Sequence, residues 1–322
     1  MALREYFQNK TDIEVIDVEN LSRLKNVVYK INTGQKYFIL KIFQNGETRD
    51  RRFRTESSIY KTYSNVCELL PQLFFEDFTC QDFGSPVICR EYKGGSDLKH
   101  RVASELSRGN DNRVKLLIRN SIGAANRIHE LKISDSYGTV LSDYPGSYLE
   151  FVLHEKNFGF GLPYEQLCKF LTEVEGGKLL ETYLTGSNLI TPQKFTLCHN
   201  DFRGHEILVG DDDTVNGVID WEQAIIGDPL CDFGSHIFSL LNSVHNDIPS
   251  QEKIIHTFLD YMPQSVDSTS LPFYLAERAV LTSIVYYYEY NPEKFKWAMR
   301  FARNMLSNSM NSRTDLIQSL KT

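Results

Sequence analysis

The chain has 322 residues, a formal net charge of −7 and a pI near 5.7. Two domains or lobes are expected, because one hydrophobic core seldom serves more than about 250–300 residues. The acidic balance excludes a general nucleic-acid binder, since neutralising phosphates requires clustered Lys and Arg.

The first 92 residues predict a small β-rich lobe. Two β-rich runs are joined by a short turn that contains Gly34, which indicates a hairpin. Residues 48–63 carry apolar side chains at helical spacing. The expected strands are 27–31, 37–43, 73–78 and 86–92. Together these elements predict an antiparallel sheet with one helix packed on it.

The rest of the chain, residues 93–322, predicts a larger and mainly helical lobe. The KGG segment after Tyr92 is a flexible break, and an amphipathic helix follows from Asp111. Residues 144–189 contain helical pieces among loops, and only helices are expected from Ser250 onward. Short strands are expected at 197–198, 206–209 and 217–221. The prediction is an α+β bilobal fold, with a ligand-binding cleft between the lobes.

The cysteines and the N-terminus predict a cytoplasmic protein. The six cysteines contain no CxxC pair and match no zinc spacing. Several lie in apolar stretches, such as Cys89 and Cys198, so buried reduced thiols are expected. The first ten residues are charged, and no apolar run is long enough for a bilayer, so no signal peptide and no membrane partner are expected.

The segment LCHNDFRGHEILVGDDDTVNGVIDWEQAIIGDPLCDFG, residues 197–234, carries the strongest chemical signal. It places His199, Asp201, Asp220 and Asp228 at ordered intervals around a predicted hairpin. Phosphoryl transfer needs a carboxylate at the acceptor hydroxyl, oxygen ligands for Mg²⁺ and a cation at the phosphates. Two acidic residues at the two ends of one hairpin can lie side by side, so that one can orient the acceptor hydroxyl while the other binds the metal.

This segment resembles the aminoglycoside phosphotransferase and choline kinase superfamily, which shares the protein-kinase-like fold. The HND at 199–201 is followed by ILV and then by Asp220 in VIDWE, and GDPLCDFG resembles a segment of the aminoglycoside phosphotransferases. The HND and SHIF (235–238) motifs more closely resemble those of the choline kinases. The resemblance runs from about residue 15 to about residue 300. It implies ATP as phosphate donor, with GTP as the alternative, and Mg²⁺ or Mn²⁺ as the metal.

The resemblance also implies roles for single residues. Asp201 corresponds to the catalytic base, Asp220 to the main metal ligand and His199 to a residue that braces the loop. Arg203 stands where protein kinases often carry a lysine that touches the transferred phosphate. The alternative for Arg203 is a surface arginine on a loop.

Glu206 departs from the family pattern, which has an asparagine as second metal ligand at this position. A carboxylate is an acceptable Mg²⁺ ligand, so Glu206 can serve as a working ligand with altered metal preference. Its extra negative charge also disfavours the binding of nucleotide phosphates. The alternative is therefore a pseudokinase or nucleotide-binding protein whose activity is lost or changed.

Lys41 and Glu56 form a predicted nucleotide-binding pair. Lys41 lies within the apolar strand YFILKIF and shares a face with Ile39 and Phe43, and Glu56 follows in the predicted helix. A lysine in mid-strand is costly in a core without a partner. The functional interpretation, which the family resemblance supports, is a lysine that reaches the α- and β-phosphates. The alternative is a solvent-facing lysine and a solvated glutamate.

Two further segments carry residues that the resemblance assigns to ATP. Ser22 and Asn26 fit the end of a loop that covers the phosphates in the family. Glu91 and Tyr92 mark the predicted hinge, whose backbone would bind adenine. The alternative for Ser22 and Asn26 is ordinary turn residues.

The acceptor is predicted only as a small molecule with a hydroxyl group: an aminoglycoside-like antibiotic, an amino alcohol or a sugar. Acidic and aromatic side chains suit an amine or quaternary ammonium group through carboxylates and cation–π contact. The alternative is a helical core with a solvated face. The candidates are Tyr148, Glu150, Phe151, Glu155, Tyr286, Tyr287 and Glu289. A protein kinase is disfavoured by the absence of an APE-type segment after Asp220. The oligomeric state is not determined by the sequence.

Overall fold

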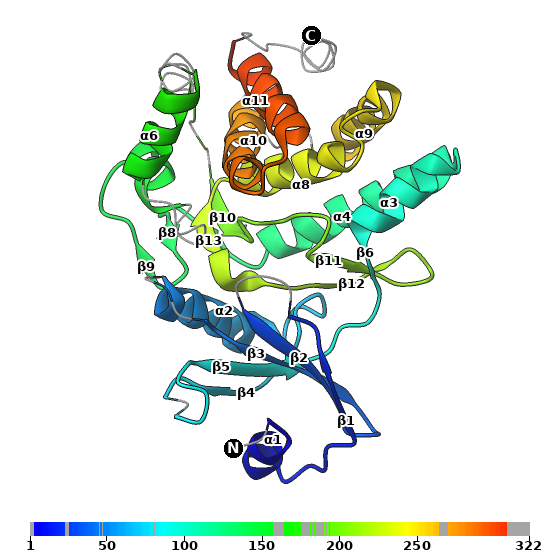
Figure 1. Ribbon diagram of the computed structural model, residues 1–322, viewed down its shortest axis with the longest axis vertical. Coiled ribbons are helices and arrows are strands. Elements are labelled where there is room, and N and C mark those ends of the chain that lie inside the picture. Colours follow the sequence, from blue (N-terminus) through cyan, green and yellow to red (C-terminus); the bar gives the residue numbers. More distant parts are fainter. Residues whose placement is uncertain are drawn as a thin grey trace.

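Two lobes stack along the long axis of the molecule (Figure 1). The computed structural model describes residues 3–22, 26–44, 46, 48–79, 81–156, 164–175, 181, 183, 190, 192, 194–263 and 270–307. A five-stranded sheet with helices on its two faces forms the lower lobe in this view, and helices dominate the upper lobe. The α+β bilobal prediction is confirmed.

The small lobe is an antiparallel sheet with the strand order β1-β2-β3-β5-β4. Its strands are β1 (Asp17–Asn20), β2 (Val27–Asn32), β3 (Tyr37–Ile42), β4 (Leu73–Asp77) and β5 (Val87–Glu91). Helix α1 (Leu3–Thr11) lies on one side, and helix α2 (Arg49–Tyr63) lies on the side that meets the large lobe (Figure 1). The predicted hairpin, helix and two further strands are all present, whereas α1 and β1 had no sequence prediction.

Alternation along β3 decides which side chains face α2. Phe38 and Leu40 are buried in the cluster that contains Phe7 of α1. Phe43 is buried in the cluster that contains Phe53 of α2. Because successive side chains of a strand point to opposite faces, Lys41 lies on the α2 face, as the sequence predicts.

The large lobe is built mainly from helices. They are α3 (Leu98–Ser107), α4 (Asp111–His129), α5 (Tyr148–Glu150), the π-helix η1 (Phe151–Glu155), α6 (Tyr164–Glu175), α8 (Leu230–Ser243), α9 (Ile248–Tyr261), α10 (Leu271–Tyr288) and α11 (Pro292–Ser307). Apolar faces of these helices bury one continuous core, and the burial of such faces is the main stabilising contribution to a helical lobe.

Two small sheets of the large lobe carry the segment predicted to be catalytic. One has the order β7-β10-β13-β8-β9 and the other β12-β11-β6. Their strands are β6 (Ser96–Asp97), β7 (Ile133–Ser134), β8 (Gly138–Thr139), β9 (Ser142–Asp143), β10 (Phe195–Cys198), β11 (Ile207–Val209), β12 (Val215–Val218) and β13 (Ile225–Gly227). Because β6 pairs with β11, the chain joins the large lobe shortly after β5 ends at Glu91. The lobe boundary at residue 92 stays a prediction.

The strand predicted at 217–221 is shorter than expected. β12 ends at Val218, and Trp221 begins the 3-10 helix η3 (Trp221–Gln223). Asp220 has φ 67° and ψ 54°, a left-handed conformation that cannot continue a strand. The Trp221 indole then donates to the Val218 carbonyl oxygen and turns the chain back.

In the described part of the chain, every helix is too short or too polar to cross a lipid bilayer.

Candidate active site

Lys41 lies at the meeting point of the two lobes and pairs with three carboxylates. Its Nζ is 2.6 Å from Glu56 Oε2, 2.5 Å from Asp220 Oδ1 and 2.8 Å from Glu222 Oε2. Burial by itself lowers the pKa of Lys41, but the three carboxylates together raise this pKa well above its usual value. The lysine is therefore charged and joins β3, α2 and η3.

Glu56 is fully buried in the middle of α2. Its second oxygen accepts a hydrogen bond from the Tyr60 hydroxyl, 2.8 Å away and one helical turn further on. Burial raises the pKa of Glu56, whereas Lys41 opposes that rise. The structure thus brings the predicted pair together and excludes the solvent-facing alternative for both residues.

Asp220 stands between β12 and η3 with 36% of its side chain exposed, so it combines a salt bridge with access to solvent. Burial would raise its pKa, but the charge and hydrogen bond of Lys41 keep the pKa below the usual value. Its left-handed backbone is uncommon outside glycine and asparagine, and such strain is often found at functional sites.

Asp201 lies in the loop after β10 and is 4% exposed. Arg278 of α10 donates to its Oδ1 at 3.0 Å, and Arg203 lies 2.8 Å from its Oδ2. Gln223 of η3 also donates to Oδ2, at 3.3 Å. The carboxylate is therefore held at both oxygens, which fixes its direction.

His199 contacts the backbone on both sides of the site. Its Nε2 lies 2.8 Å from the Ile219 carbonyl oxygen and its Nδ1 lies 3.3 Å from the Asp201 backbone nitrogen. The carbonyl accepts from Nε2–H and the backbone N–H donates to Nδ1, so these partners favour the neutral Nε2–H tautomer. The ring ties the Asp201 loop to the strand end that precedes Asp220.

Asp232 holds the same loop from helix α8. Its carboxylate accepts the backbone N–H groups of His199 at 2.9 Å and Asn200 at 2.7 Å, and it lies 3.0 Å from His129 Nε2. Burial would raise its pKa, but these partners keep the pKa below the usual value. Asn200 has a left-handed backbone, with φ 63°, inside this buried turn.

Glu206 faces the same region from the end of the loop that carries Asp201. Its Oε1 accepts from Arg203 at 3.0 Å, so Arg203 bridges Glu206 and Asp201. Burial, followed by the charge of Asp220, raises the pKa of Glu206 to about 8. Arg203 stands beside two carboxylates and is not an isolated surface arginine; its contact with a transferred phosphate stays a prediction.

The predicted phosphate-loop residues have protein partners. The Ser22 hydroxyl accepts from the Val28 backbone N–H at 2.9 Å, which makes it a turn residue at the base of the loop. Asn26 donates to Glu222 Oε2 at 2.8 Å and so links the small lobe to η3. Their contact with ATP stays a prediction.

At the hinge, two backbone donors are already used. The Glu91 N–H donates to the Gln72 carbonyl oxygen at 2.8 Å, and the Tyr92 N–H donates to the Tyr37 carbonyl oxygen at 3.2 Å. The Glu91 side chain pairs with Lys93 at 2.9 Å. Adenine binding by this backbone stays a prediction, and it would need groups other than these two donors.

Several acceptor candidates have structural roles. Phe151 and Tyr286 are buried, and Glu150 forms a capping box with Ser147. Tyr148 is buried and accepts from the Asp228 backbone N–H at 2.9 Å. Tyr287 is exposed. The alternative of a helical core fits the buried members of this set.

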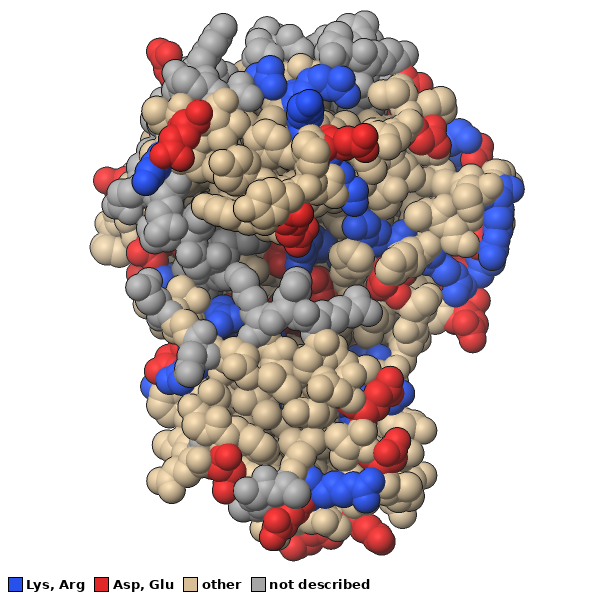
Figure 2. All heavy atoms as spheres, viewed as in Figure 1, with Lys and Arg blue, Asp and Glu red and all other residues tan. Residues whose placement is uncertain are grey.

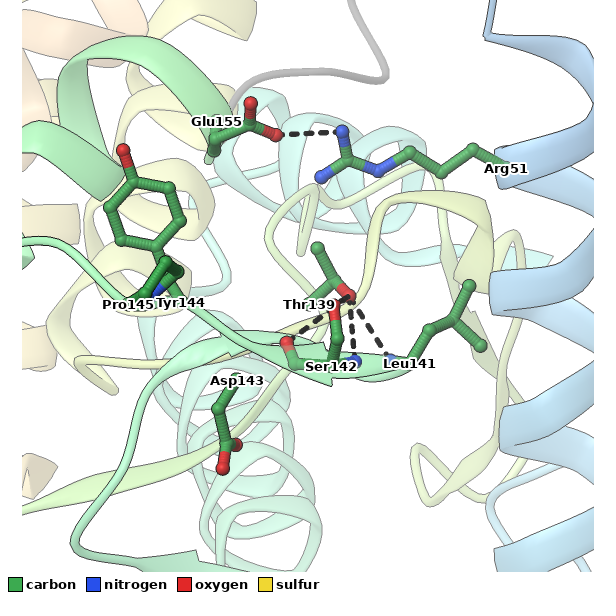
Figure 3. A pocket seen from close by; sticks show the side chains of 8 residues that line it. All are labelled: Arg51, Thr139, Leu141, Ser142, Asp143, Tyr144, Pro145 and Glu155. Atoms are coloured by element: carbon green, nitrogen blue, oxygen red, sulfur yellow. Dashed lines mark hydrogen bonds and ion pairs between the residues drawn. The ribbon is translucent and has the colours of Figure 1, made fainter.

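Glu155 lines a cavity of about 350 Å³ between α2 and the β8–β9 hairpin. It pairs with Arg51 of α2 at 2.8 Å, and Tyr144 and Asp143 also line the cavity. The Asp143 carboxylate points away from Glu155 and Arg51 (Figure 3) and accepts a hydrogen bond from Ser136 at 3.0 Å. The cavity joins elements of both lobes, since Arg51 belongs to the small lobe and Glu155 to the large one.

Comparisons with known proteins agree with this geometry. Residues 164–261 match the sequence profile of the phosphotransferase enzyme family APH. A mutant of the aminoglycoside phosphotransferase APH(4)-Ia, in a ternary complex with ADP and hygromycin B, superposes with a TM-score of 0.70 at 13% identity, covering 97% of this chain and 100% of that one. The chain has the protein-kinase-like fold of the aminoglycoside phosphotransferases and choline kinases. No curated protein sequence matches it.

Two more solved structures share this fold. Choline kinase LicA from Streptococcus pneumoniae has a TM-score of 0.60 at 16% identity, covering 92% of this chain and 98% of that one. The GDP and kanamycin complex of APH(2")-IIIa has a TM-score of 0.59 at 15% identity, covering 94% and 97%.

The acidic residues of this kinase-like site suit a magnesium ion. Asp220 and Glu206 offer hard carboxylate oxygens, the ligand type that Mg²⁺ prefers. Burial, followed by the charge of Asp220, raises the pKa of Glu206, so its carboxyl group holds a proton near neutral pH when no cation is bound. Figure 2 shows charged side chains of both signs in the recess between the lobes. A divalent cation would displace that proton and balance the charges of the two carboxylates.

Sequence reasoning missed several residues of the site. Glu222 accepts from Lys41, Asn26 and Arg52, and the acidic pair in DWE was the available signal. Arg278 had no signal, because nothing in the helix 271–288 marks one arginine as a partner of Asp201. Asp232 lies within the GDPLCDFG segment, but only the structure shows that it holds the loop.

Proposed function

We propose that the protein is a small-molecule kinase that transfers the γ-phosphoryl group of ATP to a hydroxyl group. The observation that supports this most is the contact of Lys41 with both Glu56 and Asp220, since it joins the small lobe, α2 and the acidic turn at one point. Phosphoryl-transfer sites of this fold need a lysine held by a helix glutamate beside a metal-binding aspartate. The matched phosphotransferase profile supports the same reaction class.

Lys41 would bind the phosphate tail of the nucleotide. Because three carboxylates surround it, entering phosphates would replace one of them as its partner, and Asp220 is the most exposed of the three. Mg²⁺ held by Asp220 and Glu206 would supply positive charge at the phosphates. A cytoplasmic location fits the use of ATP and the free, buried Cys198.

Asp201 would orient the acceptor hydroxyl and take its proton. Arg278 and Arg203 hold the two carboxylate oxygens, so the group is directed by the protein before the acceptor arrives. Such preorganisation lowers the cost of bringing the hydroxyl oxygen into line with the phosphorus atom. Arg203 also places positive charge beside the transferred group.

The acceptor class remains that of an aminoglycoside-like compound, an amino alcohol or a sugar. The named complexes of related fold contain hygromycin B and kanamycin, and one related structure is a choline kinase. Tyr144 and Glu155 give one cavity an aromatic and an acidic side chain, which suits an amino group.

A phosphate-transfer assay with aminoglycosides, choline-like alcohols and sugars tests the proposal, with Mg²⁺ and with Mn²⁺. We expect one acceptor class to be phosphorylated and Asp201→Asn to reduce kcat by at least about a hundredfold. Lys253→Ala is the matched control, because Lys253 forms only an exposed pair with Asp111 in the described structure.

The second candidate is a pseudokinase, which Glu206 favours because its buried carboxyl group stands beside Asp220 and resists ionisation. Nucleotide binding without transfer to any acceptor, together with activity gained in Glu206→Asn, would establish this candidate and overturn the first. Turnover by the unmodified chain would exclude it.

A further inference from the structure

We propose that Asp97, His100 and His205 form a binding site for a divalent transition-metal ion of the Zn²⁺ type, which would link helix α3 to the catalytic loop. The inference does not depend on phosphoryl transfer, because none of these three residues belongs to the Lys41 or Asp201 clusters. One ligand atom from each residue lies within 4.8 Å of the other two.

Backbone contacts place the three side chains together. Asp97 of β6 pairs with Leu208 of β11. The Lys99 N–H donates to the Gly204 carbonyl oxygen at 3.1 Å, so the first turn of α3 lies against the residue before His205. A Cβ at Gly204 would come within 2.8 Å of the Lys99 side chain, which shows how close this approach is. The ligand atoms are thus carried by hydrogen-bonded elements.

The distances suit a compact metal site. His100 Nδ1 lies 2.5 Å from Asp97 Oδ2, and His205 Nδ1 lies 3.7 Å from Asp97 Oδ1. Zn²⁺ binds imidazole nitrogen and carboxylate oxygen at about 2.0–2.2 Å, which puts tetrahedral ligand atoms about 3.4 Å apart. Only small side-chain rotations are needed, and water would complete the coordination.

His205 provides an independent indication of a missing ligand. Its Nδ1 is buried and has no hydrogen-bond partner among the described residues. A buried polar atom without a partner is uncommon in native proteins and calls for an explanation such as an ion. The Asp97 carboxylate caps α3 through the His100 N–H at 2.9 Å, which explains Asp97 but not the two converging imidazoles.

Charge and access also bear on the site. Burial would raise the pKa of Asp97, but the imidazoles of His205, at 3.7 Å, and His100, at 2.5 Å, keep this pKa below its usual value, so the carboxylate is negative. Lys99 Nζ lies 3.2 Å from His205 Nε2, on the far side of the ring from the proposed metal. Because the Lys99 ammonium donates to Nε2, this contact places the ring proton of His205 on Nδ1. A metal ion that binds at Nδ1 would displace that proton. His100 is largely exposed and gives the ion an entry path.

The ligand types distinguish this site from the nucleotide metal site. Imidazole favours zinc, copper and nickel, whereas Mg²⁺ prefers oxygen ligands. We therefore expect Zn²⁺ to bind here in the absence of nucleotide and Mg²⁺ not to compete.

Calorimetric titration of the full chain with Zn²⁺ alone tests the proposal. We expect one saturable site, weakened at least about tenfold in His100→Ala and in Asp97→Asn. Asp97→Asn keeps a side-chain oxygen that can cap α3, and thermal melting without metal checks that each variant is folded. His245→Gln is the control for a histidine elsewhere, and Asp220→Asn is the control for the nucleotide site; both should bind Zn²⁺ like the unmodified chain.

Any of three results would overturn the inference. The first is the absence of saturable Zn²⁺ binding to the unmodified chain. The other two are binding that persists in both His100→Ala and Asp97→Asn, and binding that disappears in Asp220→Asn, since in either case the ion would be held elsewhere.

Discussion

Arg278 and Asp201 form a buried ion pair although they stand 77 positions apart in the chain. Arg278 Nη1 lies 3.0 Å from Asp201 Oδ1, and Nη2 donates to the Asn200 carbonyl oxygen at 2.6 Å. Both side chains are at most 5% exposed. One guanidinium therefore fixes both the backbone and the carboxylate of the proposed catalytic loop from helix α10.

Arg278→Ala should lower both activity and stability. It leaves the Asp201 carboxylate buried beside a cavity, and breaking a buried pair in this way costs about 3–5 kcal/mol. We expect kcat to fall by at least about a hundredfold, because a misplaced carboxylate no longer orients the acceptor. Steady-state kinetics and denaturant unfolding measure the two effects.

A matched comparison is Arg127→Ala, which removes an exposed arginine that pairs with Glu68. Such surface pairs contribute about 0–1 kcal/mol, so this variant should behave like the unmodified chain. Normal kcat in Arg278→Ala would show that Asp201 is positioned without it.

Lys41 and Glu56 should show strong energetic coupling in a double-mutant cycle. Lys41→Met leaves three carboxylates facing one another without their common cation, so a loss of about 3–5 kcal/mol is expected. Glu56→Gln removes one of these charges, and the double variant should lose less than the sum of the single losses. Urea unfolding of the four proteins gives the coupling. Additive losses would mean that the pair contributes little in solution.

Glu206→Gln should separate metal binding from charge repulsion. Above about pH 8, where Glu206 is ionised, the substitution keeps the side-chain shape but removes a charge that faces Asp220. We expect ATP to bind more tightly without metal, while kcat with Mg²⁺ falls at least about tenfold because a ligand is lost. Nucleotide titration with a chelator present, followed by kinetics at varied Mg²⁺, measures both. An unchanged dependence on Mg²⁺ would exclude Glu206 as a ligand.

Asp228 should make the protein less stable as pH rises. Burial raises its pKa to about 6 in the folded chain, against about 3.9 in an unfolded one. Between these values the folded state binds more protons, so the unfolding free energy falls with rising pH, by at most about 3 kcal/mol above pH 6. Asp228→Asn removes this pH dependence of stability. The melting temperature of the variant minus that of the unmodified chain should therefore increase from pH 4 to pH 7.

Asp213→Asn is the control of opposite sign. The Arg113 hydrogen bond keeps the pKa of Asp213 below its usual value, so its carboxylate stabilises the fold once it is ionised. The Asn variant should therefore lose stability relative to the unmodified chain as pH rises. A pH-independent difference for Asp228→Asn would contradict the raised pKa.

Local sequence patterns were enough to predict the small lobe and the order of the catalytic segment. Alternation along β3 placed Lys41 on the correct face, and the helical spacing around Glu56 put its partner on the helix that covers that face. Both inferences need only the period of a strand or a helix, a property of neighbouring residues. The predicted end of β12 was wrong, because the left-handed residue that ends the strand is Asp220 and not a glycine, so the sequence there gives no turn signal.

By itself, the sequence determined the bilobal α+β fold, the Lys41–Glu56 pair and the motif around Asp201 and Asp220. Only the tertiary structure decided that Arg278 pairs with Asp201, that Asp232 accepts the backbone N–H groups of the Asp201 loop and that His205 lies beside Asp97. The physical reason is that a periodic pattern shows which face of an element is buried, whereas the partner of a buried charge depends on how distant elements pack. These polar contacts join segments that meet only after the apolar core has formed.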